Sequence, residues 1–356
     1  MKTIKYYEKL KTFIDTNRDK NAEYLLLVGE NTDFDIELLK ESNINFKGAI
    51  VPQIVYEDFN SDSGIVACEL SEDSDTIFIE DITNIDLKKE DFTQYDSVII
   101  VVDGLSKHLT TFLESIFHLL PIDCEIVGGG AGKMTLKQEP VIFSKDGILQ
   151  DAAILIAGKQ TISVGVENGW EYLEGPFIVT SAEKNLLKSL NFSNAFDVYK
   201  SIVEESSGLK FNEEQFFNIA KSYPLGIIRF NKEIVVRDAI GLDENGNIIL
   251  IGDIEQNSTI NFLTGKKEKL INSSSFAIKN ALKKIKDKDN IKNIIIFDCI
   301  SRKEFLEKDF KKELAVIKDA VPTKRVFGAL SLGEIANSGN EYINFYNRTC
   351  VVGVLC

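Results

Sequence analysis

One unit of the sequence occurs twice, and this repeat constrains the fold more than any other feature does. The first copy runs from the apolar segment Val98–Val102 to the glycine-rich segment 126–133, and the second runs from Ile294–Phe297 to 326–334. Each copy has a continuous apolar run, typical of a strand inside a sheet, then Asp-x-x-Ser, a helical pattern, a strand and glycines. Alternating strands and helices predict an α/β or mixed α+β fold. Segment 24–56 is expected to be a weaker third copy.

The length of the chain and one helical segment predict two joined lobes. At 356 residues, the chain is too long for one ordinary domain and suits two domains of roughly 150–200 residues each. Residues 194–222 are expected to form a pair of helices separated by Gly208, which makes this segment the best candidate boundary. We therefore expect an N-terminal helix over 1–22, a first lobe over 23–205 and a second lobe over 206–356.

The composition is that of an acidic globular protein with reduced cysteines. The net charge of −14 disfavours nucleic acid and anionic membrane surfaces as partners. The five cysteines form no Cys-x-x-Cys pair, so neither a disulfide framework nor a structural metal site is expected. No apolar run approaches the roughly 20 residues that span a bilayer, and the amino terminus has no secretion signal. These features predict a cytoplasmic protein with no membrane partner.

Glycines end both copies of the repeated unit. They are Gly128, Gly129, Gly130 and Gly132 in the first copy, and Gly328 and Gly333 in the second. Glycine permits tight turns, and it also lets the backbone approach a ligand closely with its N–H groups as donors. The first segment is not a Walker loop, because Val127 and Met134 occupy the positions that require glycine and a hydroxyl residue. Since ligands of open α/β sheets bind in crevices at strand ends, both segments are candidate ligand-binding elements.

Polar residues, most of them in the second copy, complete the candidate ligand-binding site. They are Asp298, Cys299, Ser301, Arg302, Ser331 and Glu334, together with Arg237. Arg302 can hold a carboxylate with two parallel hydrogen bonds, and Glu334 suits an ammonium group, so this pair predicts a clamp for an α-amino acid. Structural alternatives stay open: Arg302 and Glu334 pair with each other, Asp298 caps the following helix, and Cys299 is a small buried hydrophobe. Arg237 has the same ambiguity.

The order and spacing of these segments resemble the FIST domain, a ligand-sensing module of bacterial signalling. The resemblance covers residues 24–355, nearly the whole chain. It rests on segments 48–54, 126–132, 165–170 and 194–199, and then on 223–226, 236–241, 297–302, 327–335 and 347–349. The resemblance implies two joined lobes that form an intracellular sensor of small ligands, with an amino acid or a small carboxylate as the ligand. It also implies a signalling partner protein, such as a histidine kinase.

Three alternatives to a small-ligand sensor stay open. The first is a haem sensor, since some FIST proteins are haem-based nitric-oxide sensors; His108 and His118 are both expected on the polar face of one helix, which argues against a haem, so no cofactor is assigned although haem stays possible. An enzyme that uses Cys299 or a carboxylate is the second alternative. No catalytic residue is assigned, because no histidine follows Ser331 as the usual order of a hydrolase triad requires. The third is a scaffold whose acidic surface binds a basic partner.

Overall fold

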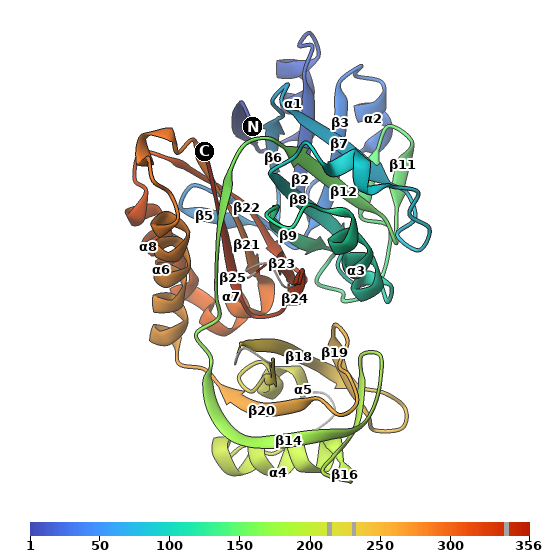
Figure 1. Cartoon of the computed structure of the whole chain (residues 1–356), viewed down its shortest axis with the longest axis vertical. Helices are drawn as coiled ribbons and strands as arrows, with labels where there is room; N and C mark the ends of the chain where they lie inside the picture. Colours follow the sequence, from blue (N-terminus) through green and yellow to red (C-terminus); the bar gives the residue numbers. More distant parts are fainter. Residues whose placement is uncertain (212–215, 230–232, 338–341) are drawn as a thin grey trace.

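The computed structural model describes residues 1–211, 216–229, 233–337 and 342–356, and it has two lobes of different size (Figure 1). The larger lobe contains both chain termini and three six-stranded sheets, and the smaller lobe contains one seven-stranded sheet. Helices and mixed sheets together make the fold α/β with two lobes, as predicted. Among the described helices, none has the length and apolar character needed to cross a membrane.

The three sheets of the larger lobe share one strand order. The first has the order β1 (Thr3–Tyr7), β6 (Ile65–Glu69), β2 (Glu23–Gly29), β3 (Asn45–Val51), β10 (Ile142–Ser144), β11 (Gly147–Leu149). The second has the order β7 (Ser74–Ile79), β12 (Ala153–Gly158), β8 (Ser97–Asp103), β9 (Glu125–Ala131), β23 (Glu334–Ala336), β24 (Asn344–Tyr346). The third has the order β13 (Ile162–Glu167), β25 (Cys350–Leu355), β21 (Asn293–Cys299), β22 (Arg325–Ser331), β4 (Gln53–Tyr56), β5 (Phe59–Ser61).

The repeated unit occurs three times in the larger lobe, once at the centre of each sheet. The parallel pairs β2–β3, β8–β9 and β21–β22 are the three copies, and the first of them is the predicted copy over 24–56. After its second strand, each copy sends a hairpin into another sheet: β4–β5 pairs with β22, β10–β11 with β3, and β23–β24 with β9. Each sheet is therefore completed by a hairpin that follows the central strand pair of a different sheet. Since no copy completes its sheet alone, the three copies depend on one another.

The helices follow the apolar pattern of the sequence. Helix α3 (Leu109–Leu119) lies where a helix over 107–120 is predicted, and its buried residues form one stripe against the second sheet. The other helices of this lobe are α1 (Leu10–Asn17), α2 (Ile36–Lys40), α6 (Lys267–Lys283), α7 (Ile300–Leu306) and α8 (Phe310–Ala320). In place of a single helix over 1–22, the chain starts with strand β1, because these residues pair with β6, and α1 follows.

The smaller lobe is a rolled sheet packed against two helices. Its strand order is β14 (Glu171–Glu183), β20 (Thr259–Thr264), β17 (Leu225–Ile228), β18 (Ile234–Leu242), β19 (Ile248–Ile251), β15 (Leu186–Leu190), β16 (Ser193–Asn194). Strand β14 also pairs with β15, which turns the sheet back on itself. Tyr199 of α4 (Ala195–Ser207) packs between Phe216 of α5 (Phe216–Ala220) and Phe262 of β20. These aromatic rings form the core between the sheet and the helices.

The chain crosses between the lobes twice, after β13 at residues 168–170 and after β20 at residues 265–266 (Figure 1). The helical pair predicted as the lobe boundary lies inside the smaller lobe, although part of it, 212–215, falls outside the described residues. Gly208 ends α4 with a left-handed φ of 71°, and the boundary predicted after residue 205 falls within this helix. A relative movement of the lobes would therefore bend the two crossings.

Candidate functional site

The glycine segments 128–132 and 328–333, from the β8–β9 and β21–β22 copies, contact each other, and backbone atoms fill the space between them. Gly128–Gly130 lie within strand β9 and not in a turn, because β9 continues to Ala131 and pairs with β23. The Gly130 N–H donates a hydrogen bond to the Gly333 carbonyl oxygen (2.8 Å). A Cβ atom added at Gly130 would lie 2.5 Å from the Leu332 carbonyl oxygen. Where the sequence predicts a cavity shared by the two copies, the structure has close backbone packing.

The remaining predicted glycines also make room for neighbouring groups. A Cβ atom at Gly132 would lie 2.3 Å from the Leu332 side chain, and one at Gly328 would lie 1.8 Å from the Ile296 carbonyl oxygen. Gly333 has a φ of +96°, and the ring of Phe345 occupies the space where its side chain would be. Packing therefore accounts for all three positions.

Arg302, one half of the predicted clamp, is fully buried and is surrounded by protein acceptors. Its Nη2 atom lies 2.7 Å from a carboxylate oxygen of Glu313, and its Nε atom lies 3.4 Å from Asp298. The guanidinium also donates to the carbonyl oxygens of Leu270 (2.8 Å) and Asn168. Arg302 therefore connects α6, α7, α8 and the first crossing between the lobes, and its donors are already in use.

Glu334, the other half of the predicted clamp, is bound by different groups. Its carboxyl group accepts from the Ser331 hydroxyl (3.0 Å) and from the Thr349 backbone N–H (3.2 Å). Asp298, Cys299 and Ser301 are at most 4% exposed. The structure thus brings the predicted polar residues of the β21–β22 copy together. They form a sealed polar cluster and not an open clamp.

Glu313 is the counter-ion of Arg302 that the sequence analysis missed. It lies on α8, where Phe310, Leu314 and Ile317 are buried on the same face as Glu313. A glutamate on the apolar stripe of a helix is unusual, because a buried carboxylate needs a partner. That interruption of the stripe is the signal that predicts a buried cation nearby.

The charges of this cluster balance when two of its carboxyl groups hold protons. Burial raises the pKa of Asp298 and the pKa of Glu334 well above the usual range, and neighbouring carboxyl groups add to both shifts. One oxygen of Asp298 and one of Glu313 have no hydrogen-bond partner in the described part of the chain. A proton on Asp298 supplies the missing donor to Glu313, which then remains the counter-ion of Arg302. Potential metal-ligand atoms of Asp298, Glu313 and Cys350 lie within 4.8 Å of one another, but the guanidinium already supplies the positive charge.

A second buried arginine joins the two lobes. Arg348 precedes β25 in the larger lobe, and it forms an ion pair with Asp238 of β18 in the smaller lobe. Its guanidinium lies 5.2 Å from the centre of the Trp170 ring, and the Trp170 indole N–H donates to the Arg348 carbonyl oxygen (3.1 Å). Because Trp170 belongs to the first crossing, these contacts join the two lobes next to that crossing.

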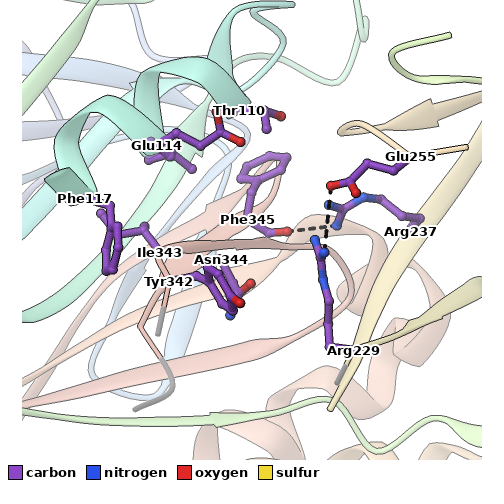
Figure 2. Close-up of a pocket in the computed structure, with 11 residues that line it drawn as sticks. Thr110, Glu114, Phe117, Arg229, Arg237, Glu255, Tyr342, Ile343, Asn344 and Phe345 are labelled. Carbon is purple, nitrogen blue, oxygen red and sulfur yellow. Dashed lines mark hydrogen bonds and ion pairs between the residues drawn. The ribbon is translucent and has the colours of Figure 1, made fainter. Parts of the chain in front are cut away.

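A pocket of 180 Å³ lies at the junction of the two lobes (Figure 2). Helix α3 and segment 342–345 contribute from the larger lobe, and β18 and its neighbouring segments contribute from the smaller lobe. The lining residues are Thr110, Leu113, Glu114, Phe117, Arg229, Arg237, Glu255, Tyr342, Ile343, Asn344 and Phe345. Of the residues predicted for the ligand site, Arg237 is the one that lines this pocket.

Two arginine side chains of this pocket retain N–H groups that no described group accepts. Arg237 is 6% exposed and donates from Nε to the Asp253 carbonyl oxygen (2.9 Å) and from Nη1 to those of Val236 (3.1 Å) and Phe345 (2.8 Å). Its Nη2 atom donates to no residue in the described part of the chain. Burial, with the nearby charge of Arg229, lowers the pKa of Arg237 to about 10. The Arg229 Nε atom is buried and has no partner, while its Nη1 atom lies 3.9 Å from Glu255.

Acidic and polar side chains lie opposite the arginines. Thr110 and Glu114 are one helical turn apart on α3, and Figure 2 shows the Phe345 ring between them and Arg237. Asn344 lines the same pocket and donates to the Tyr346 hydroxyl (3.0 Å). Carboxylates and guanidinium groups in one small pocket can hold a ligand that carries both charges.

A second pocket, of 220 Å³, adjoins the first and shares Thr110 and Phe345 with it. It lies at the end of strand β8, where Gly104, Leu105, Ser106 and Lys107 contribute to its wall. The sequence analysis gave no site here, because the arginines and the lobe contact come from segments that are far apart in the chain. The Asp-x-x-Ser motif at 103–106 was the available signal.

The two histidines do not form a common site. His118 is exposed, and His108 lines a separate hollow of 290 Å³ with Thr83, Thr111 and Ser115. No cysteine, methionine or tyrosine is among the described residues that line this hollow, so it offers no second axial ligand of the usual kinds for a haem iron.

Comparisons with protein families match two consecutive domains, and the boundary between them lies within the smaller lobe. Residues 40–192 match the FIST N domain, and residues 195–337 match the FIST C domain. No individual curated protein matches the chain significantly. The two matched regions together cover most of the chain in the order that the sequence predicts. The chain therefore belongs to the FIST-domain proteins, whose domains are sensory domains of signal transduction proteins.

Proposed function

We propose that this protein is a cytoplasmic sensor that binds a small carboxylate, including the carboxylate of an α-amino acid, in the 180 Å³ pocket between its lobes. One observation carries the proposal: Arg229 and Arg237 line the same pocket, and each has an N–H group that no described protein group accepts. Unused donors on charged, partly desolvated groups favour an anionic ligand, since an unpaired buried cation is costly.

The pocket also suits the second charge of an amino acid. Glu114 and Glu255 supply carboxylates near the two arginines, and Asn344 and Thr110 supply neutral polar groups. A carboxylate on Arg237 and an ammonium group near Glu114 would connect the smaller lobe to α3. Such a ligand binds best when the lobes are close, which gives it the differential affinity that a conformational signal requires.

Ligand binding would change the contacts between the two lobes, and this change would be the signal. Arg237 donates to the Phe345 carbonyl oxygen, and Phe345 belongs to the β23–β24 hairpin that completes the second sheet. A ligand that engages Arg237 would therefore act on this hairpin. We propose that the changed surface is recognised by a partner protein such as a histidine kinase.

Thermal unfolding with added ligand tests the proposal. We expect α-amino acids or small monocarboxylates to raise the melting temperature, and their uncharged amides to have no effect, because a ligand bound only to the folded state stabilises it. Arg229→Gln should weaken binding by about 10-fold to 100-fold, the value of a charge-assisted hydrogen bond of about 1.5–3 kcal/mol. Arg18→Gln, which removes a comparably exposed arginine paired with Asp15, is the matched control. Equal binding of acids and amides, or an unchanged affinity in Arg229→Gln, would contradict the proposal.

A further inference from the structure

Two residues, Phe345 and Thr110, line both pockets at the lobe junction. Figure 2 shows the phenyl ring of Phe345 directed toward α3. The carbonyl group of Phe345 accepts a hydrogen bond from Arg237 (2.8 Å). Phe345, which lies between the pockets, is therefore held by an arginine that lines the first pocket.

Glycines from both lobes fix the position of this ring. A Cβ atom at Gly333, in the larger lobe, would lie 2.0 Å from the tip of the Phe345 ring. A Cβ atom at Gly252, in the smaller lobe, would lie 3.1 Å from its edge. The ring is therefore seated between two positions that have no side chain, and it forms the wall between the pockets.

The second pocket combines an apolar patch with polar and charged groups. Leu105, Leu109, Ile240 and Ile249 provide apolar surface from both lobes. Its amide side chains are already engaged: Gln138 donates to Asp103 and Asp151 (2.8 Å each), and Asn185 donates to the Leu250 carbonyl oxygen (3.0 Å). These two amide side chains have partners within the protein, so an apolar group of a ligand would displace neither of them, and Lys107, Lys184 and Asp253 line other parts of the same pocket.

We infer that the ligand is an amphipathic carboxylate whose charged end binds at Arg229 and Arg237 and whose apolar chain passes Phe345 into the second pocket. Phe345 then sets the size of the apolar group that can pass. This inference rests on the proposed carboxylate site and specifies the ligand that the site selects. The shared chemistry belongs both to simple monocarboxylates and to α-amino acids with unbranched apolar side chains.

Calorimetric titration of the full chain with two homologous series tests the inference. The first series is acetate, butanoate, hexanoate and octanoate, and the second is glycine, norvaline and norleucine. We expect affinity to rise roughly fourfold for each methylene group that becomes buried. Comparison of the two series distinguishes the sources, because tighter binding of the amino acids at equal chain length indicates that Glu114 and Glu255 hold the ammonium group.

Substitutions at Phe345, the residue between the pockets, test the apolar pocket independently of the proposed carboxylate site. Phe345→Ala should move the preferred chain to greater length or bulk, whereas Phe345→Leu should keep the wild-type preference. If Phe345→Ala does not fold, Ile249→Thr should reduce the gain per methylene group while it leaves acetate or glycine binding unchanged. Affinity that depends on Arg229 but not on chain length would overturn the inference and leave the carboxylate site intact. Absence of binding by every acid in both series would overturn both.

Discussion

The ends of strands β8 and β21 carry the same motif but have opposite environments. Asp103-Gly-Leu-Ser106-Lys107 starts at the last residue of β8, and Asp298-Cys-Ile-Ser301-Arg302 starts at the last residue but one of β21. Lys107 is exposed and lines the 220 Å³ pocket between the lobes. Arg302, at the equivalent position, is fully buried and paired with Glu313. One motif therefore ends at an open pocket in one copy and inside a core in the other.

The helices that follow the two strands account for this difference. After β21, helix α7 begins at once, and its Arg302 side chain reaches the Leu270 carbonyl oxygen of α6 and Glu313 of α8. After β8, a turn precedes α3, and the facing layer is the smaller lobe. Helices α6 and α8 cover the end of β21, whereas the end of β8 borders a pocket between the lobes and stays accessible. The comparison shows that the same motif ends at an open pocket where the facing layer is the other lobe, and in a sealed core where the facing layer is a pair of helices.

The largest expected effect comes from removing the buried cation. Arg302→Met leaves Glu313 without its partner, and breaking a buried ion pair in this way should cost about 3–5 kcal/mol of unfolding free energy. The equivalent substitution Lys107→Met should change it by no more than about 0.5 kcal/mol, because Lys107 is exposed. Chemical denaturation of the two variants measures both values, and equal losses would show that the two strand ends do not differ.

The substitution Gly130→Ala tests how closely the β8–β9 and β21–β22 copies are packed against each other. Gly130→Ala should destabilise the fold by about 1–3 kcal/mol, because its Cβ atom meets a backbone carbonyl oxygen at 2.5 Å and cannot be accommodated by a side-chain rotation. Gly241→Ala is the control, since its Cβ atom would meet nothing within 4 Å. A Gly130→Ala protein as stable as this control would mean that the two copies are loosely packed where Gly130 contacts Leu332.

The sealed cluster should also make stability depend on pH. Burial raises the pKa of Glu334 in the folded state, so above about pH 4.3 the unfolded chain loses a proton that the folded chain keeps. Stability should therefore fall as pH rises, by up to about 1.4 kcal/mol per pH unit, until pH passes the folded pKa. Glu334→Gln removes this contribution, so its stability relative to the wild type should increase from pH 5 to pH 8. Parallel curves for the two proteins in denaturant melts would contradict the assignment.

The sequence was sufficient to predict features that depend on local pattern. The apolar runs at 98–102 and 294–297 predicted β8 and β21, and the stripe over 107–120 predicted α3. The exchange of hairpins was beyond such reasoning, because β23 pairs with β9 over more than two hundred residues of intervening chain. The same limit applies to the site, since Arg229 and Glu114 become neighbours only when the smaller lobe packs against α3.

Hydrogen–deuterium exchange in the presence and absence of octanoate, with norleucine as a second probe, tests most directly whether one strand end is open and the other sealed. The account predicts slower exchange on ligand addition in the segments 104–110, 249–253 and 343–345, which border the two pockets. It predicts no change in 298–306, where Arg302 is enclosed by protein groups. Slower exchange in 298–306 and 328–334, with none in 104–110, would contradict it.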